Sequence, residues 1–290
     1  MSYKRGNVGD TWVEREGVRL FVKDYGGDGP PLVMLHSTGF GHWMWEPHAR
    51  ELSKRFRVYA PDQRGHGNSD KVQGFAFDNL AMDMQAVFEA LGLRETFAIG
   101  HSAGGTTLAT HAALFPGCIR RLLMVEPVTP LGRDMAQPPV AGIPNPNAMA
   151  ERTRRRRASF GSAAEMFESF RGRPPFDTWT EESLRLYCEQ GTRPAEGGIE
   201  LKCPPDLEAR FYEAVADSDV STRFAQVQIP VRVLWGESGH RGGVGLGGTT
   251  GTLVPRGEAR TVPATTHFIP MEKPEVVIAE ALDFFGKDAG

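Results

Sequence analysis

Short apolar runs alternate with amphipathic stretches over the first 125 residues, which predicts strands alternating with helices. Pro31–Leu35, Thr96–Gly100 and Ile119–Val125 are apolar runs of strand length, typical of buried parallel strands. Phe77–Leu91 instead places apolar residues three and four positions apart and stops at Gly92, which predicts a helix buried on one face. The alternation predicts an α/β fold with a doubly wound, mostly parallel sheet. The other elements predicted in this part are the strands Thr11–Glu16, Val18–Tyr25 and Arg57–Ala60 and the helices His42–Arg55 and Ala103–Phe115.

The alternation stops after Pro127 and resumes near residue 226. No strand-like run is visible in between, and prolines separate stretches of helical character. The helices predicted there are Ala148–Phe160, Ala163–Phe170, Glu181–Glu189 and Asp206–Ala216; beyond them the strands Val231–Trp235 and Ala259–Val262 and the helix Pro274–Phe285 restore the first pattern. We therefore predict a core domain of residues 1–127 and 226–290, with residues 128–225 inserted as a helical cap over the sheet.

Composition narrows the classes of partner. A chain of 290 residues with 40% hydrophobic content can form one large catalytic domain with an insertion. The net charge of -3 gives no electrostatic case for nucleic acid or anionic membranes as partners. The start of the chain has no apolar signal region, no run reaches the roughly 18 residues that span a bilayer, and the three cysteines lack metal-ligand spacing. We expect a cytoplasmic protein without a metal; oligomeric state is left open.

Gly100-His101-Ser102-Ala103-Gly104 is a G-x-S-x-G sequence with a strand-like run before it and a helical pattern after it. A serine at such a turn is held in a strained backbone conformation that presents its hydroxyl, and the glycines leave room for the turn. The free N–H groups at the start of the helix can stabilise a developing oxyanion. A glycine-rich turn with a chance serine is the alternative, but the context favours Ser102 as a nucleophile.

A serine hydroxyl needs a base, and the chain offers eight histidines. His267 is favoured because it follows the predicted strand Ala259–Val262 late in the chain. The loops at the carboxyl ends of the strands converge on one edge of such a sheet, so Ser102 and His267 can meet there. A surface histidine without a catalytic role is the alternative.

Together these motifs resemble the α/β-hydrolase fold family over essentially the whole chain. The matching segments are His36-Ser37-Thr38-Gly39, Asp62-x-Arg64-Gly65-His66-Gly67-x-Ser69, the Ser102 motif, Trp235-Gly236-Glu237 and His267-Phe268-x-Pro270-x-Glu272. The resemblance implies an oxyanion hole formed by the backbone N–H groups of Thr38 and Ala103. The chain departs from the family at Ser37, where glycine is usual.

The third member of a serine triad is a buried carboxylate beside the histidine. Much of the family carries an aspartate two residues after the Gly-Glu that ends the strand matching Val231–Trp235. Here that position is Gly239, and residues 238–257 contain no carboxylate.

Glu126 lies at the end of the preceding predicted strand. The resemblance to certain haloalkane dehalogenases and fungal mycotoxin lactonases, which take their acid from that strand end, implies the same role here. The order Ser102, Glu126, His267 fits this family. Glu126 is the predicted acid, with Glu237, or no strict acid, as alternatives.

Gly243-Val244-Gly245-Leu246-Gly247-Gly248 fits the G-x-G-x-x-G pattern of dinucleotide sites. No helical periodicity follows it, and no βαβ unit with a ribose-binding acid surrounds it. We therefore predict no cofactor, and interpret Gly239–Gly251 as a flexible replacement for the usual helix and acid loop.

The predicted cap supplies charge and aromatic side chains. The basic run Arg154–Arg157 is interpreted as a solvated helix face, with steering of carboxylate-bearing substrates as the alternative. Small-molecule pockets in this fold lie between cap and core. Most of the aromatic residues pack the two layers together; those predicted to line an apolar pocket are Phe40, Trp43, Phe176 and Trp179.

The reaction expected from these residues is hydrolysis of a carboxylic ester or lactone of a small, largely apolar substrate through an acyl-enzyme. Two alternatives remain. The same constellation could cleave a carbon–carbon bond of a ring-cleavage product, or the chain could be a small-ligand receptor derived from a hydrolase. A serine nucleophile argues against haloalkane dehalogenases and epoxide hydrolases, in which the family uses aspartate.

Overall fold

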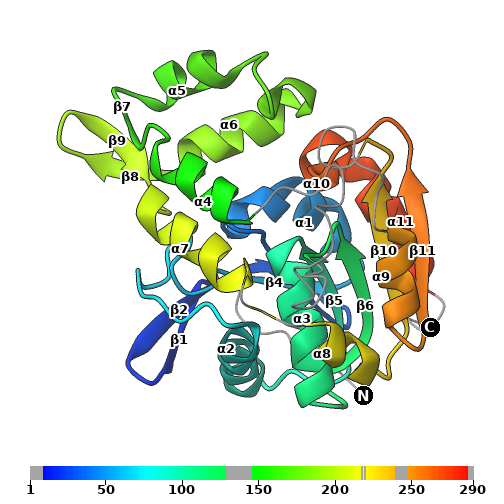
Figure 1. Ribbon diagram of the computed structural model, residues 1–290. Coiled ribbons are helices and arrows are strands. Elements are labelled where there is room, and N and C mark those ends of the chain that lie inside the picture. Colours follow the sequence, from blue (N-terminus) through cyan, green and yellow to red (C-terminus); the bar gives the residue numbers. More distant parts are fainter. Residues whose placement is uncertain (1–8, 129–145, 217, 219, 239–246, 287–290) are drawn as a thin grey trace.

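The computed structural model describes residues 9–128, 146–216, 218, 220–238 and 247–286. Eight strands form one sheet in the order β1-β2-β4-β3-β5-β6-β10-β11 (Figure 1). Only β1 and β2 run antiparallel to their neighbours; β4, β3, β5, β6, β10 and β11 are parallel. The strands are β1 (Thr11–Arg15), β2 (Val18–Gly26), β3 (Pro31–Leu35), β4 (Arg57–Pro61), β5 (Thr96–His101), β6 (Ile119–Val125), β10 (Val231–Gly236) and β11 (Gly257–Val262).

Helices cover both faces of this sheet. One face packs against α2 (Phe77–Ala90), α3 (Ala103–Leu114) and α8 (Ser221–Gln226), and the other against α1 (Glu46–Leu52) and α11 (Pro274–Gly286). Successive strand residues point to opposite faces. In β3, Val33 and Leu35 therefore belong to the first apolar cluster, whereas Leu32 and Met34 belong to the second. Burial on both sides explains the continuous apolar runs, and the predicted α/β fold is confirmed.

The insertion carries strands as well as helices. Its elements are α4 (Pro146–Arg154), β7 (Ser159–Phe160), α5 (Ala163–Phe170), the 3-10 turn η2 (Phe176–Thr178), α6 (Glu181–Gln190), β8 (Thr192–Ala195), β9 (Gly198–Leu201) and α7 (Pro205–Ala216). The three strands pair antiparallel in the order β7-β9-β8, so the expectation of an insertion without strands is wrong. In Figure 1 these elements lie together beyond one end of the sheet, in green and yellow.

The C-terminal part of the predicted cap packs against the core domain. Phe224 of α8 is buried in the core cluster beneath α3, although α8 begins before residue 226. Phe211 of α7 also lies against the core, with its ring 5.1 Å from that of Phe75. The end of the insertion is therefore embedded in the core domain.

The segment after β10 is also less irregular than expected. Residues 239–246, which contain most of the glycine-rich pattern, lie outside the described residues. A short helix, α9 (Gly247–Leu253), follows and packs beside β10 and β11, so the interpretation of a loop without a helix is wrong from residue 247 onward. The remaining elements are the 3-10 turn η1 (His42–Trp45) and α10 (Ile269–Glu272). None of the helices in the described ranges has the length and apolar character needed to cross a bilayer.

Candidate active site

Four loops meet at the carboxyl edge of the parallel strands. β3 is the point from which the chain winds in both directions, with β4 on one side and β5 on the other. Ligands of open α/β sheets bind at such a switch point, outside the carboxyl ends of the strands. The oxyanion loop follows β3, Ser102 follows β5, Glu126 follows β6 and His267 lies in the loop after β11.

Ser102 has the strained backbone that the sequence pattern predicts. Its φ and ψ are 52° and -120°, and it forms the N-cap of α3. The turn is tight enough to exclude side chains at its neighbours: a Cβ at Gly100 would lie 2.5 Å from the Cα of Gly105, and one at Gly104 would lie 2.3 Å from the carbonyl oxygen of Leu35. The glycines of the motif thus allow β5, α3 and the end of β3 to approach one another.

Glu126 and His267 are hydrogen-bonded. Glu126 Oε2 lies 3.2 Å from His267 Nδ1, and Glu126 Oε1 accepts a bond from the backbone N–H of Gly236 at 2.5 Å. Glu126 is 2% exposed and has a positive φ of 49°. A carboxylate can only accept, so His267 Nδ1 carries the proton and its Nε2 keeps a lone pair.

The alternative acid, Glu237, is occupied elsewhere. Glu237 is exposed, and its Oε2 accepts a bond from the backbone N–H of Ala264 at 2.9 Å. Among the two candidate carboxylates, the structure brings only Glu126 to the imidazole of His267.

The backbone beside His267 is held by two groups that the sequence analysis did not single out. His101, the residue before the nucleophile, has its Nε2 2.8 Å from the carbonyl oxygen of His267 and donates to it. Glu272 accepts from the backbone N–H of Thr266 at 2.7 Å. The bond from His101 links the loop of His267 directly to the turn of Ser102.

Burial controls the protonation of the imidazole. It lowers the pKa of His267 from 6.5 to about 4, because charge is disfavoured away from water. His267 is therefore neutral at physiological pH, the state that a general base requires.

The two predicted oxyanion donors are the backbone N–H groups of Ala103 and Thr38. Ala103 is the first residue of α3, so its N–H has no acceptor within the helix, and none is recorded for the N–H of Thr38 within the described part of the chain. Ser37 is accommodated without a positive φ, and its carbonyl accepts from His36 Nδ1 at 2.8 Å. The left-handed conformation falls on Gly39 instead, with φ at 84°.

The four predicted pocket residues belong to one aromatic cluster between cap and core. Phe40 lies 5.5 Å from Trp43 and 5.8 Å from Trp179, measured between ring centroids, and Trp179 lies 4.9 Å from Phe176. Tyr187 and Phe268 complete the cluster, each in contact with Phe40. Because Phe268 follows His267 and Phe40 follows the oxyanion loop, apolar surface borders the site on two sides.

The basic run Arg154–Arg157 is interpreted from its sequence as a solvated helix face. One of its residues does not fit this interpretation. Arg154 and Arg157 pair with partly exposed carboxylates of the cap. Arg156 instead points inward: its Nη1 lies 2.9 Å from Glu208 Oε2, and its Nη2 donates to the Tyr187 hydroxyl at 2.7 Å. Nothing in the local sequence signals this contact, because Glu208 is 52 positions away.

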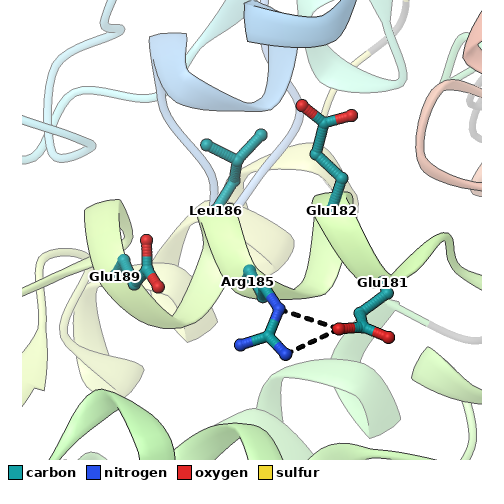
Figure 2. A pocket seen from close by; sticks show the side chains of 5 residues that line it. All are labelled: Glu181, Glu182, Arg185, Leu186 and Glu189. Carbon is teal, nitrogen blue, oxygen red and sulfur yellow. Dashed lines mark hydrogen bonds and ion pairs between the residues drawn. The ribbon is translucent and has the colours of Figure 1, made fainter.

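A separate depression on α6 has a different chemistry. Figure 2 shows the residues that line it: Glu181, Glu182, Arg185, Leu186 and Glu189. Arg185 is bonded there to Glu181 at 2.6 Å and 2.9 Å. None of these residues contacts the group around Ser102, and the charged lining differs from the apolar lining usual for small-molecule pockets. In the described ranges, no group of three histidines, cysteines or carboxylates is arranged to hold a metal ion.

Comparisons with known proteins concern the family and the fold. A family model described as the alpha/beta hydrolase fold matches residues 30–274. The chain is 26% identical over 259 residues to 2-(acetamidomethylene)succinate hydrolase of Mesorhizobium japonicum, covering 89% of this chain and 88% of that one. It is also 26% identical over 279 residues to a bifunctional esterase/perhydrolase of Acinetobacter calcoaceticus, covering 93% and 97%. The crystal structure of an E-2-(acetamidomethylene)succinate hydrolase superposes with a TM-score of 0.83 at 25% identity, covering 96% of this chain and 98% of that one.

Proposed function

This chain belongs to the alpha/beta hydrolase fold family, and we propose that it is a serine hydrolase that cleaves a carboxylic ester or lactone. The proposal rests on one observation above all: a buried Glu126–His267 pair is tied by His101 to the strained turn of Ser102. A nucleophile, a neutral base and a carboxylate that orients the base are the groups that acyl transfer needs.

The reaction proceeds in two halves. Ser102 Oγ attacks the substrate carbonyl while His267 Nε2 takes its proton, and the N–H groups of Thr38 and Ala103 stabilise the oxyanion. His267 then returns the proton to the leaving alcohol, which leaves an acyl-Ser102 ester. A water molecule, deprotonated by the same nitrogen, releases the acid. Glu126 stabilises the imidazolium that forms in each half.

The relatives support hydrolysis more directly than they support a substrate. One is named for its action on a succinate derivative and another as an esterase. At 26% identity we carry over to this chain only hydrolysis, and attack by Ser102 on a carbonyl carbon is our own proposal. The ester or lactone bond is our proposal, supported by the apolar surface beside the site.

Labelling with a fluorophosphonate probe tests the nucleophile. We expect wild-type protein to be labelled at one residue and to release a burst of nitrophenol from a nitrophenyl ester, and we expect Ser102→Ala to do neither. Ser238→Ala, at an exposed serine, is the matched control and should label normally. An unlabelled wild-type protein would overturn the assignment of Ser102.

Two further outcomes separate the alternatives left open by the sequence. Labelling without turnover of any ester or lactone, together with cleavage of a dienoate diketone, would assign carbon–carbon bond hydrolysis to the same residues. Labelling with no turnover of either class, and tight binding of a small ligand, would assign a receptor.

A further inference from the structure

A buried polar group lies where the cap meets the oxyanion loop. Arg156, between α4 and β7, forms its ion pair with Glu208 in the first turn of α7 and its hydrogen bond with Tyr187 of α6. The Glu208 side chain is 5% exposed, whereas that of Arg156 retains 29%. Part of the Arg156 side chain therefore stays accessible beyond its two partners.

The group touches the loop that borders the nucleophile. A Cβ at Gly39 would lie 2.7 Å from Glu208 Oε1, so the loop passes close to this carboxylate. On the other side, the Tyr187 ring lies 5.5 Å from that of Phe40. Gly39 and Phe40 directly follow Thr38, one of the two proposed oxyanion donors.

Cations outnumber carboxylates in this region. Lys71 and Lys202 are half-buried, and burial lowers the pKa of each, with that of Lys71 reaching about 8. The ammonium of Lys71 is bonded to three backbone carbonyls, and no carboxylate partner is recorded for Lys202 within the described residues. The carboxylates are Glu208, which pairs with Arg156, and Asp62, whose oxygens accept from His42 and Asn68. Three cations thus face two carboxylates.

The buried thiol of Cys203 lies near Glu208, Arg156, Lys71 and Gly39. Its pKa is raised, first by burial and then by Glu208, whereas Arg156, Lys71 and the backbone N–H of Gly39 lower it. An excess of positive charge in a half-buried region is unfavourable unless an anion offsets it. Such an excess is therefore expected where an anionic ligand completes the site.

We propose that this cluster is a specificity site for a carboxylate on the substrate, with Arg156 as the residue that binds it. This inference deepens the proposed function, on which it rests, by naming the substrate class: esters or lactones whose acyl part ends in a carboxylate. Arg156 donates to the carboxylate, while Glu208 and Tyr187 hold its guanidinium in place. Lys202, the residue before Cys203, adds a positive charge to the same region.

The position of the cluster limits the length of the acyl part. Glu208 lies against Gly39 and Tyr187 against Phe40, the two residues that follow Thr38. We therefore expect a short acyl part, with about two to four carbons between the scissile carbonyl and the carboxylate. Half-esters of short dicarboxylic acids fit this description.

The test compares two esters of equal shape. Monoethyl succinate carries the carboxylate, and ethyl 4-methylpentanoate replaces it by an isopropyl group. We expect the ratio of their kcat/KM values to favour the anionic ester at least tenfold in the wild type. Arg156→Met should lower that ratio by about 10- to 100-fold, because a charge-assisted hydrogen bond is lost. Arg156→Lys should restore part of it.

Two variants control for charge and folding. Arg155→Met removes an equal charge from an exposed neighbour and should leave the ratio unchanged. If Arg156→Met does not fold, as judged by circular dichroism, Lys202→Met provides the second test and should lower the ratio severalfold. A ratio near one in the wild type, or one that Arg156→Met and Lys202→Met leave within twofold, overturns the inference and leaves the serine hydrolase assignment intact.

A binding measurement separates failure of the inference from failure of the function. Sodium succinate, titrated calorimetrically at constant ionic strength, should bind wild-type protein and Arg155→Met, and binding should be lost in Arg156→Met. Binding of this kind by a protein that turns over no ester or lactone would support the carboxylate site and overturn the proposed ester hydrolysis. Absence of succinate binding to the wild type contradicts the carboxylate site.

Discussion

At the scale of single residues, the position of Glu126 shapes the proposed site. It stands directly after β6, its φ is positive, and its two carboxylate oxygens bind different elements, Gly236 of β10 and His267 after β11. Gly236 permits this arrangement, because a Cβ there would lie 2.4 Å from the carbonyl oxygen of Thr266. A carboxylate from β6 can therefore serve an imidazole that the family more often pairs with an acid after the strand corresponding to β10.

Glu126→Gln should lower kcat by about 1,000-fold while leaving the fold intact. The amide oxygen can still accept from Gly236, but the charge that orients and stabilises the imidazolium is lost. The measurement is steady-state hydrolysis of a nitrophenyl ester, with thermal unfolding as the check on folding. Glu237→Gln is the matched control and should stay within about threefold of wild type, and the reverse pattern would transfer the acid to Glu237.

The pH profile follows from the buried imidazole of His267. Because burial lowers its pKa to about 4, the base is neutral above that pH, and kcat/KM should rise with pH along an acid limb centred near 4 rather than near 6.5. Glu126→Gln should move this limb to lower pH, because the carboxylate favours the protonated ring. Initial rates taken within seconds of a pH jump give the profile, and a midpoint at or above 6.5 would contradict a buried neutral base.

At the scale of elements, the start of α3 shows how the glycines of the motif act. Gly104 faces the end of β3, with the backbone oxygens of Leu35 and His36 within 2.5 Å of where its Cβ would be. Backbone atoms cannot move aside as a flexible side chain can. The contact therefore fixes the distance between α3, which carries Ser102, and the loop that carries Thr38.

Gly104→Ala should destabilise the protein by about 2–3 kcal/mol and reduce turnover, because the helix must move away from β3. Chemical denaturation measures the first effect and nitrophenyl ester hydrolysis the second. Ala113→Gly, near the other end of α3, should cost about 1 kcal/mol through helix propensity alone and leave turnover unchanged. Equal effects of the two substitutions would show that the close approach at Gly104 has no special role.

The core elements could be predicted from the sequence, whereas parts of the cap could not. Strands such as β3 and β6 are buried on both faces, and that burial leaves a continuous apolar run in the sequence. β8 and β9 are four residues each, mostly partly exposed, and β8 contains a proline, so they have no such run. Their pairing depends on a tight turn and on tertiary contacts.

The site divides in the same way. Ser102 and His267 lie in local sequence patterns that predict where they are placed. Ser102 lies in a G-x-S-x-G sequence between a strand and a helix, and His267 follows a late strand. The pairing of Arg156 with Glu208, and the bond from His101 to the carbonyl of His267, join residues far apart in the chain. Such contacts depend on how the cap and the loops pack, and no spacing in the sequence encodes them.

At the scale of the whole molecule, buried neutral histidines connect the core to the site. Among the described residues, five histidines have a pKa lowered by burial: His267 to about 4, His48, His66 and His111 to about 3, and His36 in the same direction. In the unfolded chain each returns to the ordinary value near 6.5. Unfolding therefore takes up protons below that pH, and stability must fall as the pH falls from 6.5 toward 4.

Near pH 5.5 the unfolded chain binds about four more protons than the folded one, so the free energy of unfolding should fall by about 5 kcal/mol per pH unit. That slope is large against a typical total of roughly 5–15 kcal/mol, and it predicts cooperative acid unfolding near pH 5, before most carboxylates titrate. Glu208, whose pKa burial raises, opposes the trend by less than one proton. Urea denaturation between pH 7.5 and 5 measures the slope, and His111→Gln should reduce it by about one proton. A slope of one proton or fewer would contradict the buried neutral state of these histidines, and with it the neutral base on which the proposed chemistry depends.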